Sequence, residues 1–397
     1  MTARHSRSAA EWEAPPLLPG DHYVSAEVYR SRALFDLEIE RIFRKTWKFV
    51  CHESELPAPG DFRAYEYCGL PILTIRSLDG TIRSFLNVCS HRSAPLVRER
   101  SGNASSLRCF FHLWGYDTYG NCTNVTRDVG YEELGPAKES LGLRAIRTST
   151  DIGLIFINLD DDAAPLPDFL GSSIDCLRDC MGTKPLEVFH FHKVVLKANW
   201  KQWHETNMDG YHHWGHVINR MTNLKAEGAF DRKWLLCDNG HGTIDPARIS
   251  YANVKGWADR TNVLPGLEPG ELRAVDLFPN TAIIVRGSCV RIDTSSPIGP
   301  DATLLECRGL GIAGEPVQER AARIRDHNQY WGPFGRNLSE DIAFVQSVAE
   351  SNRGAARYSL MSRREEMRAM DEGVLRHFYK EWSKLTGESA SRPGGDR

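Results

Sequence analysis

The chain has 397 residues, of which 41% are hydrophobic and 25% charged, and its formal net charge is −3. A chain of this length accommodates two domains, and the composition is that of an ordinary globular protein. The nearly balanced charge argues against nucleic acid or an anionic membrane as a partner, and no run approaches the ~20 apolar residues of a membrane helix.

The N-terminal segment combines a leader with a helix. Residues 1–16 contain arginines and a histidine but no apolar core behind them, so we interpret them as a leader and not as a secretory signal. Residues 25–48 place apolar side chains among charges at helical spacing, which predicts one amphipathic helix. We therefore assign residues 1–44 to a leader and a helix that packs on the larger domain. Ten cysteines without a signal sequence predict reduced thiols and a cytoplasmic protein.

A small all-β domain is expected at residues 45–165. From residue 61 onward the sequence consists of short β-rich segments, and the turn sequence LDG at 78–80 lies between two of them, which predicts a hairpin. The segments continue to residues 153–159. An acidic, proline-rich stretch at 160–170 is typical of a linker, so we place the domain boundary there.

Residues 166–390 are expected to form a larger α+β domain. Segment 187–198 alternates like a strand and 199–217 is predicted to be a helix, and further strands and helices follow. The Gly-x-Gly-x-x-Gly sequence at 309–314 lacks the βαβ context of a dinucleotide site, so electrons for any redox reaction must come from another protein. Amphipathic helices are predicted at 315–330, 338–353 and 363–385.

Two mixed pairs of cysteine and histidine form the first candidate site. Cys89-x-His91 is followed, after seventeen residues, by Cys109-x-x-His112. Two thiolates on one iron and two imidazoles on the other are the ligand set of a Rieske [2Fe–2S] cluster, and the imidazoles raise its reduction potential. A zinc site is the alternative, but zinc fingers place their two cysteines together and their two histidines together. The mixed order therefore favours the cluster.

His212 and His216 form the core of the second candidate site. They are four residues apart, so on a helix they would share one face. Two imidazoles and one distant carboxylate make the facial triad of non-haem Fe(II) oxygenases, which leaves positions open for O₂ and substrate. The expected carboxylate is Asp341, at the start of a predicted helix, and Glu340 is the alternative.

With these motifs the chain resembles the Rieske non-haem iron oxygenases, the family of ring-hydroxylating dioxygenase α subunits, from about residue 25 to 385. The family's two cluster motifs, C-x-H-R and C-x-x-H-x-W-x-Y-D, match residues 89–92 and 109–117. Its Gly-Pro-x-Gly turn before the carboxylate ligand matches residues 332–335. Its iron-site motif matches Asn199, Trp200, Lys201, Glu205, Asp209, Tyr211 and His212.

The sequence departs from the family pattern at three points. Phe110 stands where proline is usual and Leu113 where glycine is usual, and neither change removes a ligand. Three residues separate His212 from His216 where the family usually has four, so His213 is an alternative second ligand.

The resemblance implies a fold and a set of cofactors. A small Rieske domain would accompany a catalytic domain of the helix-grip type, an antiparallel sheet with helices. The resemblance also implies a homotrimer, either α3 or α3β3, in which Asp209 bridges the metals of neighbouring subunits by hydrogen-bonding a ligand histidine on each. The implied cofactors are one [2Fe–2S] cluster, held by Cys89, His91, Cys109 and His112, and one Fe(II), held by His212, His216 and Asp341.

The implied function is that of the terminal oxygenase in a multicomponent system. A ferredoxin or a flavin reductase would deliver electrons from NAD(P)H, and O₂ would be used to mono- or dioxygenate a small aromatic substrate. One alternative is a Rieske monooxygenase that hydroxylates or demethylates an aliphatic or quaternary amine. The other is a non-catalytic Rieske electron carrier.

Overall fold

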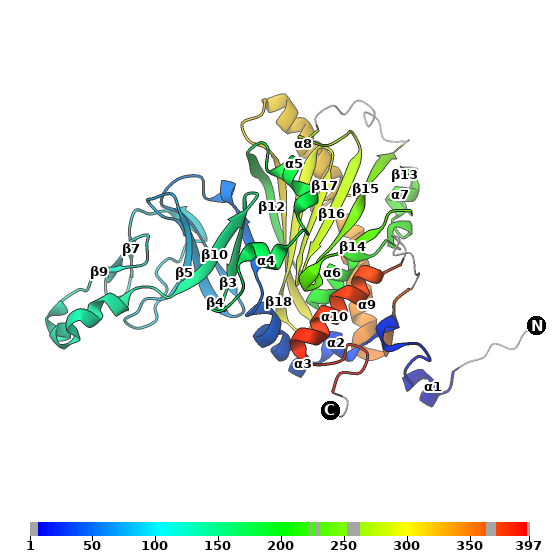
Figure 1. Cartoon of the computed structure of the whole chain (residues 1–397), viewed down its shortest axis with the longest axis horizontal. Coiled ribbons are helices and arrows are strands. Elements are labelled where there is room, and N and C mark those ends of the chain that lie inside the picture. The colour runs from blue at the N-terminus through cyan, green and yellow to red at the C-terminus, as the bar shows by residue number, and fades with distance from the viewer. Residues whose placement is uncertain are drawn as a thin grey trace, which may run out of the picture. The chain divides into compact units, whose positions relative to one another are not determined.

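The computed structural model describes residues 7–210, 212–221, 224–227, 231–251, 263–362 and 371–394, which divide into two compact units (Figure 1). The β unit comprises Phe43–Asp168 and Leu186–Val188. The α+β unit comprises Met1–Ile42, Phe169–Pro185 and Phe189–Arg397. No helix in the described ranges is long and apolar enough to cross a membrane.

The β unit consists of antiparallel strands in two sheets. The larger sheet has the order β2-β11-β10-β5-β4-β3-β6, and the smaller has the order β7-β8-β9. The hairpin predicted at 78–80 is confirmed, because β4 and β5 pair on either side of it. The strands are β2 (Lys48–His52), β3 (Asp61–Tyr67), β4 (Leu70–Arg76), β5 (Ile82–Leu86), β6 (Ser101–Asn103), β7 (Leu107–Arg108), β8 (Gly115–Tyr116), β9 (Cys122–Asn124), β10 (Ala145–Asp151) and β11 (Leu154–Asn158).

The α+β unit is built on one antiparallel sheet with the order β12-β19-β18-β17-β16-β15-β13, and β14 also pairs with β15. Its strands are β12 (Leu186–Leu196), β13 (Leu224–Glu227), β14 (Trp234–Leu236), β15 (Gly242–Tyr251), β16 (Glu271–Leu277), β17 (Thr281–Arg286), β18 (Cys289–Gly299) and β19 (Ala302–Ile312). The antiparallel sheet with helices that the family resemblance implies is thus confirmed.

Helices cover this sheet. Helix α6 contacts β17, β18 and β19, helix α8 contacts β18 and β19, α9 packs on α6, and α10 packs on α6 and β14 (Figure 1). A two-stranded sheet joins the start of the chain to its last third. The bounds are β1 (Tyr23–Ser25), α2 (Glu27–Arg30), α3 (Arg32–Glu38), α4 (Leu166–Leu170), α5 (Arg178–Met181), α6 (Trp200–Met208), α7 (Val217–Met221), α8 (Val317–Tyr330), α9 (Leu338–Gly354), β20 (Tyr358–Leu360) and α10 (Gly373–Thr386).

The prediction of one helix over residues 25–48 is wrong. The segment is divided into α2, α3, a π-helical turn at Ile39–Phe43 and the start of β2. The first break is at Ser31, which has an extended backbone and whose hydroxyl accepts a hydrogen bond from the Leu34 N–H at 3.3 Å. A serine cap of this kind starts a new helix, because it satisfies a backbone donor that the first turn leaves open.

The prediction of one helix over residues 199–217 is also wrong. Helix α6 begins after Asn199, whose side chain caps it, and ends at Met208. Asp209 is extended, with φ −98° and ψ 119°, and Gly210 follows it, so the chain leaves the helix there. His212 then lies in a short 3₁₀ turn and His216 just before α7, so the two histidines do not share one helical face.

A buried ion pair anchors α6 to the N-terminal helices. Lys201 Nζ lies 2.6 Å from Glu38 Oε1, and neither side chain is more than 1% exposed. The indole N–H groups of Trp200 and Trp382 donate to the same carboxylate at 2.8 and 2.7 Å. The Trp-Lys dipeptide that follows Asn199 therefore holds α3, α6 and α10 together.

The glycine-rich sequence at 309–314 continues β19 and does not open a nucleotide-binding loop. A Cβ atom at Gly309 would meet the His327 ring at 2.6 Å, and one at Gly311 would meet the Arg323 side chain at 2.1 Å. The glycines thus allow α8 to pack closely on the strand.

Candidate active site and metal centres

The first candidate site lies in two loops of the β unit that share one backbone pattern. The Cys89 carbonyl accepts from the Ser93 N–H at 3.0 Å, and the Cys109 carbonyl accepts from the Leu113 N–H at 3.0 Å. Ser93 and Leu113 both have left-handed backbones, with φ of 59° and 61°. The glycine usual at position 113 would adopt this conformation without strain, which explains the family preference.

The two thiols of this site are buried. Cys89 is 2% exposed and Cys109 1% exposed, and both belong to the hydrophobic core of the β unit. The Tyr116 hydroxyl lies 3.3 Å from Cys89 Sγ and accepts from the Ser90 N–H at 3.0 Å. A hydroxyl at that distance can donate to a thiolate, which is the form of cysteine that binds metal.

His91 is oriented by its neighbours. Its ring stacks on Trp114 at 4.8 Å, its Nε2 lies 3.1 Å from the Tyr131 hydroxyl, and its ring centre is 4.5 Å from that of His112. Its Nδ1 is buried and has no hydrogen-bond partner among the described residues. Burial, and then the neighbouring His112, lowers the pKa of His91, which favours the neutral imidazole. A neutral imidazole with one nitrogen held and the other open fits a metal ligand.

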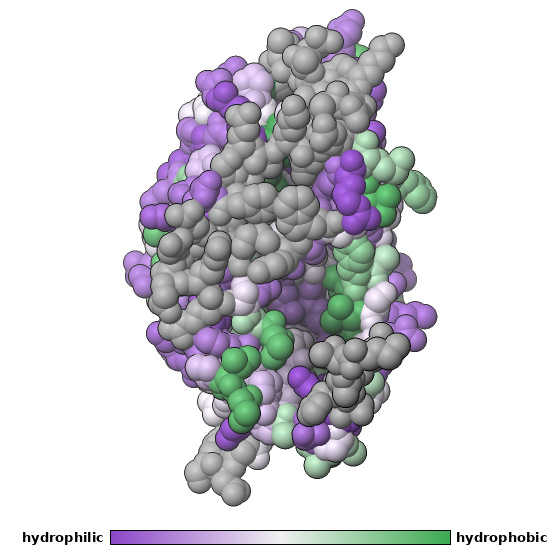
Figure 2. Space-filling model, turned by 90° about the vertical axis from the view of Figure 1, so that its right-hand side faces the viewer, coloured by the Kyte–Doolittle hydropathy of each residue, from purple (hydrophilic) through white to green (hydrophobic). Residues whose placement is uncertain are grey.

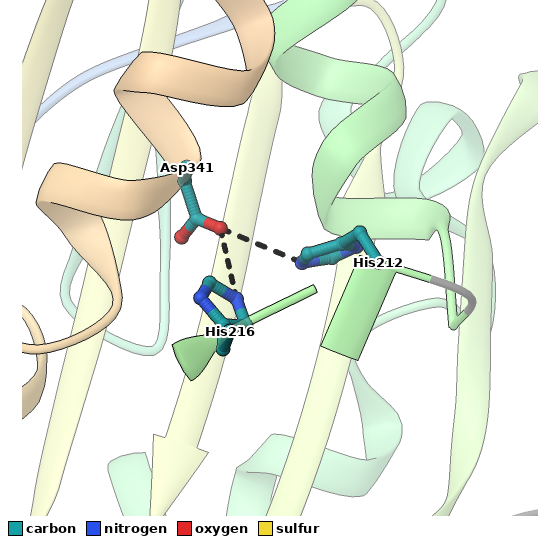
Figure 3. Close-up of side chains that lie close together, drawn as sticks. All are labelled: His212, His216 and Asp341. Carbon is teal, nitrogen blue, oxygen red and sulfur yellow. Dashed lines mark ion pairs between the residues drawn. The ribbon is translucent and has the colours of Figure 1, made fainter. Parts of the chain in front are cut away.

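The second candidate site brings together three side chains from two parts of the α+β unit (Figure 3). Asp341 Oδ1 lies 3.1 Å from His216 Nε2 and 3.5 Å from His212 Nε2. The ligand atoms all lie within 4.8 Å of one another. Two imidazoles and a carboxylate in this arrangement match the donor set of a non-haem iron site.

A second carboxylate lies behind each histidine. His216 Nδ1 is 2.6 Å from Glu340 Oε2, and His212 Nδ1 is 3.5 Å from Asp209 Oδ2. Burial would lower the pKa of His216, but its hydrogen bonds with Asp341 and Glu340 outweigh burial and raise it. Carboxylates in this position orient an imidazole and increase its strength as a metal ligand.

The alternatives left open by the sequence lie close to this group. Glu340 contacts the far nitrogen of His216, so it faces away from the point where the three side chains converge. The ring centre of His213 is 4.8 Å from that of His212, but His213 does not belong to the converging group. Tyr211, which is part of the family motif, lies outside the described residues.

A cavity of about 120 Å³ adjoins His212, His216 and Asp341. The face of the molecule seen in Figure 2 is hollowed near its centre, where hydrophilic residues lie at depth. Besides the candidate ligands, the cavity walls contain apolar and cationic side chains. The apolar ones are Trp234, Ile244, Ile249, Leu272, Ala274, Ile284 and Trp331, and the cationic ones are Arg232, Arg286 and Arg291.

The register of the sheet explains most of this wall. Cross-strand pairing aligns Trp234 with Ile244, Ile244 with Ala274, Ala274 with Ile284, and Ile284 with Arg291. Directly paired residues share one face of an antiparallel sheet, so this row crosses five strands on the cavity side. No linear motif contains such a row, and sequence analysis therefore missed the arginines. Arg286 and Arg291 are marked only by a charge at the end of an apolar strand or inside one, and Arg232 lies outside the strands.

Comparison with known proteins identifies both units. A family model for the Rieske [2Fe-2S] domain matches residues 46–133, and one for the catalytic domain of the ring-hydroxylating alpha subunit matches residues 184–388. The structure is similar to the crystal structure of naphthalene 1,2-dioxygenase from Rhodococcus sp. bound to indole, with a TM-score of 0.79 and 21% identity over 92% of this chain and 94% of that one.

Two curated relatives span the whole chain. The chain is 42% identical to the 2-aminobenzenesulfonate 2,3-dioxygenase subunit alpha of Alcaligenes sp over 98% of this chain and 99% of that one. It is 37% identical to the methanesulfonate monooxygenase hydroxylase subunit alpha of Methylosulfonomonas methylovora over 98% of this chain and 97% of that one.

Proposed function

The chain belongs to the Rieske ring-hydroxylating oxygenases, and we propose that it is the oxygenase of a small organic sulfonate. As a member of this family it is an oxidoreductase, the terminal oxygenase component that takes electrons from a ferredoxin or a reductase. It carries one [2Fe–2S] cluster and one mononuclear iron. Ten free cysteines support a reducing compartment, and we place the protein in the cytoplasm.

For the cluster we propose two thiolate ligands, Cys89 and Cys109, and two imidazole ligands, His91 and His112. The ligand set is the one that a Rieske cluster requires. The buried thiols, the matching backbone of the two loops and the open Nδ1 of His91 support this assignment.

For the mononuclear iron we propose His212, His216 and Asp341. The convergence of their ligand atoms within 4.8 Å carries the proposal. When bound, the iron would supply the activation of O₂, with electrons from the cluster. The protein orients the ligands through Asp209 and Glu340 and surrounds the substrate with a mostly apolar wall that excludes water.

We further propose that the chain works as a trimer, α3 or α3β3, in which Asp209 is the bridge between the metals of neighbouring subunits. One oxygen of Asp209 lies 3.5 Å from His212 Nδ1, while 23% of the side chain is exposed. Asp209 can therefore contact a ligand histidine and still be reached by a group from another chain.

The sulfonate is proposed because two relatives that each span 98% of the chain, at 42% and 37% identity, are named for sulfonates, one aromatic and one aliphatic. An aromatic sulfonate would be dioxygenated and an alkanesulfonate monooxygenated. A quaternary amine, the other substrate class considered, would place its positive charge beside Arg232 and Arg286, which is unfavourable in a desolvated cavity.

Metal analysis and electron paramagnetic resonance of the purified protein test the metal assignment. We expect about three irons per chain and a reduced-cluster signal. Asp341→Ala should remove one iron, abolish oxygenation and leave the cluster signal intact. An Asp341→Ala variant that retains three irons, or that oxygenates as fast as the wild type, would overturn the assignment of Asp341 as an iron ligand.

Turnover of sulfonates under ¹⁸O₂ with a suitable electron donor tests the substrate. We expect labelled product from 2-aminobenzenesulfonate or methanesulfonate, with two labelled atoms for dioxygenation and one for monooxygenation. Oxygenation of an uncharged arene such as naphthalene, without turnover of either sulfonate, would refute the sulfonate proposal.

A further inference from the structure

The cavity beside the candidate iron ligands combines an apolar wall with an excess of positive charge. Its lining contains three arginines and two aspartates. Both aspartates, Asp209 and Asp341, lie next to the ligand histidines, where a metal would offset their charge. Apart from His213 and the neutral polar side chains of Thr206, Asn207, Asn219 and Asn337, the remaining wall is apolar or cationic, so it suits a molecule with an apolar body and one anionic group.

The three arginines differ in their surroundings. Arg291 is 3% exposed and is bound to Asp293 within the sheet, so an acidic neighbour already balances its charge. Arg286 ends strand β17, and its guanidinium lies over the rings of Tyr330 at 4.4 Å and Trp331 at 5.3 Å. A guanidinium that stacks by its face still donates along its edge, where it can hold two oxygens of an anion at once.

Arg232 precedes strand β14 and lines the same cavity. Burial lowers the pKa of Arg232 to about 10, and the charge of Asp245 only partly opposes this. Burial therefore works against the charge of this guanidinium, and an anionic ligand in the cavity would stabilise it. Arg232 and Arg286 line the same cavity, so one ligand bound there can contact both.

We propose that Arg232 and Arg286 bind the anionic head group of the substrate and thereby direct its carbon skeleton toward His212, His216 and Asp341. This inference rests on the proposed function for the identity of the head group, a sulfonate. The three oxygens of a sulfonate can accept hydrogen bonds from both guanidinium groups at once. The apolar row that ends at Trp234 would contact the organic part.

Binding of two probes of similar size to the iron-loaded protein tests this proposal. Benzenesulfonate carries the charge, and methyl phenyl sulfone lacks it. By isothermal titration, Arg286→Gln and Arg232→Gln should each weaken benzenesulfonate binding by about 10- to 100-fold and leave sulfone binding unchanged. Arg286→Lys should recover part of the loss, because it keeps the charge but not the forked donor geometry.

Arg248→Gln is the matched control. Arg248 is exposed and adjoins Ile249 on β15, so strand alternation turns it away from the cavity wall that Ile249 lines. The control should bind both probes like the wild type, and all variants should keep the wild-type iron content and melting temperature. Equal losses for both probes in the Arg286 and Arg232 variants, or no loss for either, would overturn the proposal.

The outcome also separates this proposal from the proposed function. If the wild type oxygenates sulfonates but the glutamine variants bind benzenesulfonate normally, the arginine proposal is wrong and the function stands. If the wild type binds benzoate and not benzenesulfonate, and the same variants lose benzoate, the arginines bind the anion and the sulfonate assignment is wrong.

Discussion

Glu340 and Asp341 are adjacent in the chain, yet they contact opposite nitrogens of His216. Asp341 lies 3.1 Å from Nε2 and Glu340 lies 2.6 Å from Nδ1. The first turn of α9 therefore carries both a proposed iron ligand and the group that fixes the tautomer of another ligand. A carboxylate at Nδ1 favours the tautomer that carries its proton there, which would leave Nε2 free to bind the iron.

Glu340→Gln should weaken iron binding about 10- to 100-fold without changing the cluster. The amide is a weaker acceptor than the carboxylate, so it orients His216 less firmly and makes it a poorer donor. Titration of the metal-depleted protein with Fe(II) under anaerobic conditions measures the change. Glu350→Gln, an exposed position on the same helix, is the control. Wild-type iron affinity in Glu340→Gln would show that Glu340 does not support the ligand.

A second carboxyl group near the iron site controls stability through its protonation. Burial raises the pKa of Glu205 to about 7, although the hydroxyls of Tyr379 and Tyr29 donate to it and oppose the shift. Between its ordinary value of 4.5 and about 7, the folded protein holds a proton here that the unfolded chain releases. The stability from this group is complete below pH 4.5 and is lost as the pH rises through 7.

Glu205→Gln should therefore remove this loss. From pH 5 to pH 8 the unfolding free energy of the variant should rise by about 2–3 kcal/mol relative to that of the wild type, because its neutral amide still accepts from both tyrosines and does not ionise. Denaturant unfolding at several pH values, compared between the two proteins, measures the gain. A difference between them that does not change with pH would mean that Glu205 is ionised in the folded protein at both ends of the range.

At the residue scale the metal-site candidates could be predicted and the substrate-site candidates could not. Cysteine and histidine at short, mixed spacings are rare without a metal, so His91 and its partners are conspicuous in the sequence. Arg286 and Arg291 lie on different strands, and only the register of the sheet brings them to one cavity. That register depends on turns and packing across the whole unit, which a single sequence does not specify.

Among the elements, α3, α6 and α10 meet at the buried carboxylate of Glu38. Glu38→Gln would keep an acceptor for the indole N–H groups of Trp200 and Trp382 but would leave the Lys201 ammonium buried without its counter-charge. We expect a loss of about 3–5 kcal/mol in the free energy of unfolding.

The double variant Glu38→Gln with Lys201→Met should be less destabilised than Glu38→Gln alone, because it removes the buried charge that the single change leaves behind. Denaturant unfolding followed by circular dichroism measures both. Asp36→Asn is the control, since Asp36 pairs with Arg32 where both side chains are more than half exposed, and it should cost less than about 1 kcal/mol. The single variant Lys201→Met completes the cycle, and a double-variant loss equal to the sum of the two single losses would show that Glu38 and Lys201 do not act as a pair.

The two segments that were wrongly predicted to be single helices both contain residues that end a helix. Apolar periodicity continues through residues 25–48 and 199–217, but Ser31 in the first and Asp209-Gly210 in the second end a helix by local hydrogen bonding or backbone freedom. Such residues are common inside helices too, so their effect depends on packing. The break at Asp209 matters for function, since it lets His212 turn toward Asp341 while Asp209 stays at its other nitrogen.

At the scale of the whole molecule, the proposed trimer predicts that two inactive variants can restore activity together. A His91→Ala chain lacks a cluster ligand but keeps the iron site, and an Asp341→Ala chain keeps the cluster but lacks the iron ligand. If electrons cross between subunits, a trimer containing both chains has sites where an intact cluster faces an intact iron. Random assembly of equal amounts would give about one quarter of the wild-type sites overall, and about one third in the trimers that contain both chains.

The two chains, carrying different tags, would be co-expressed and purified through both tags, and turnover would be measured against each variant alone. Activity in the doubly purified protein, with none in either single preparation, would establish transfer between subunits. Introducing Asp209→Asn into the chain that keeps its iron should abolish that activity while both metals remain bound, because the amide cannot accept from both ligand histidines as the carboxylate does. A doubly tagged protein that holds both metals and stays inactive would place the electron path within one chain.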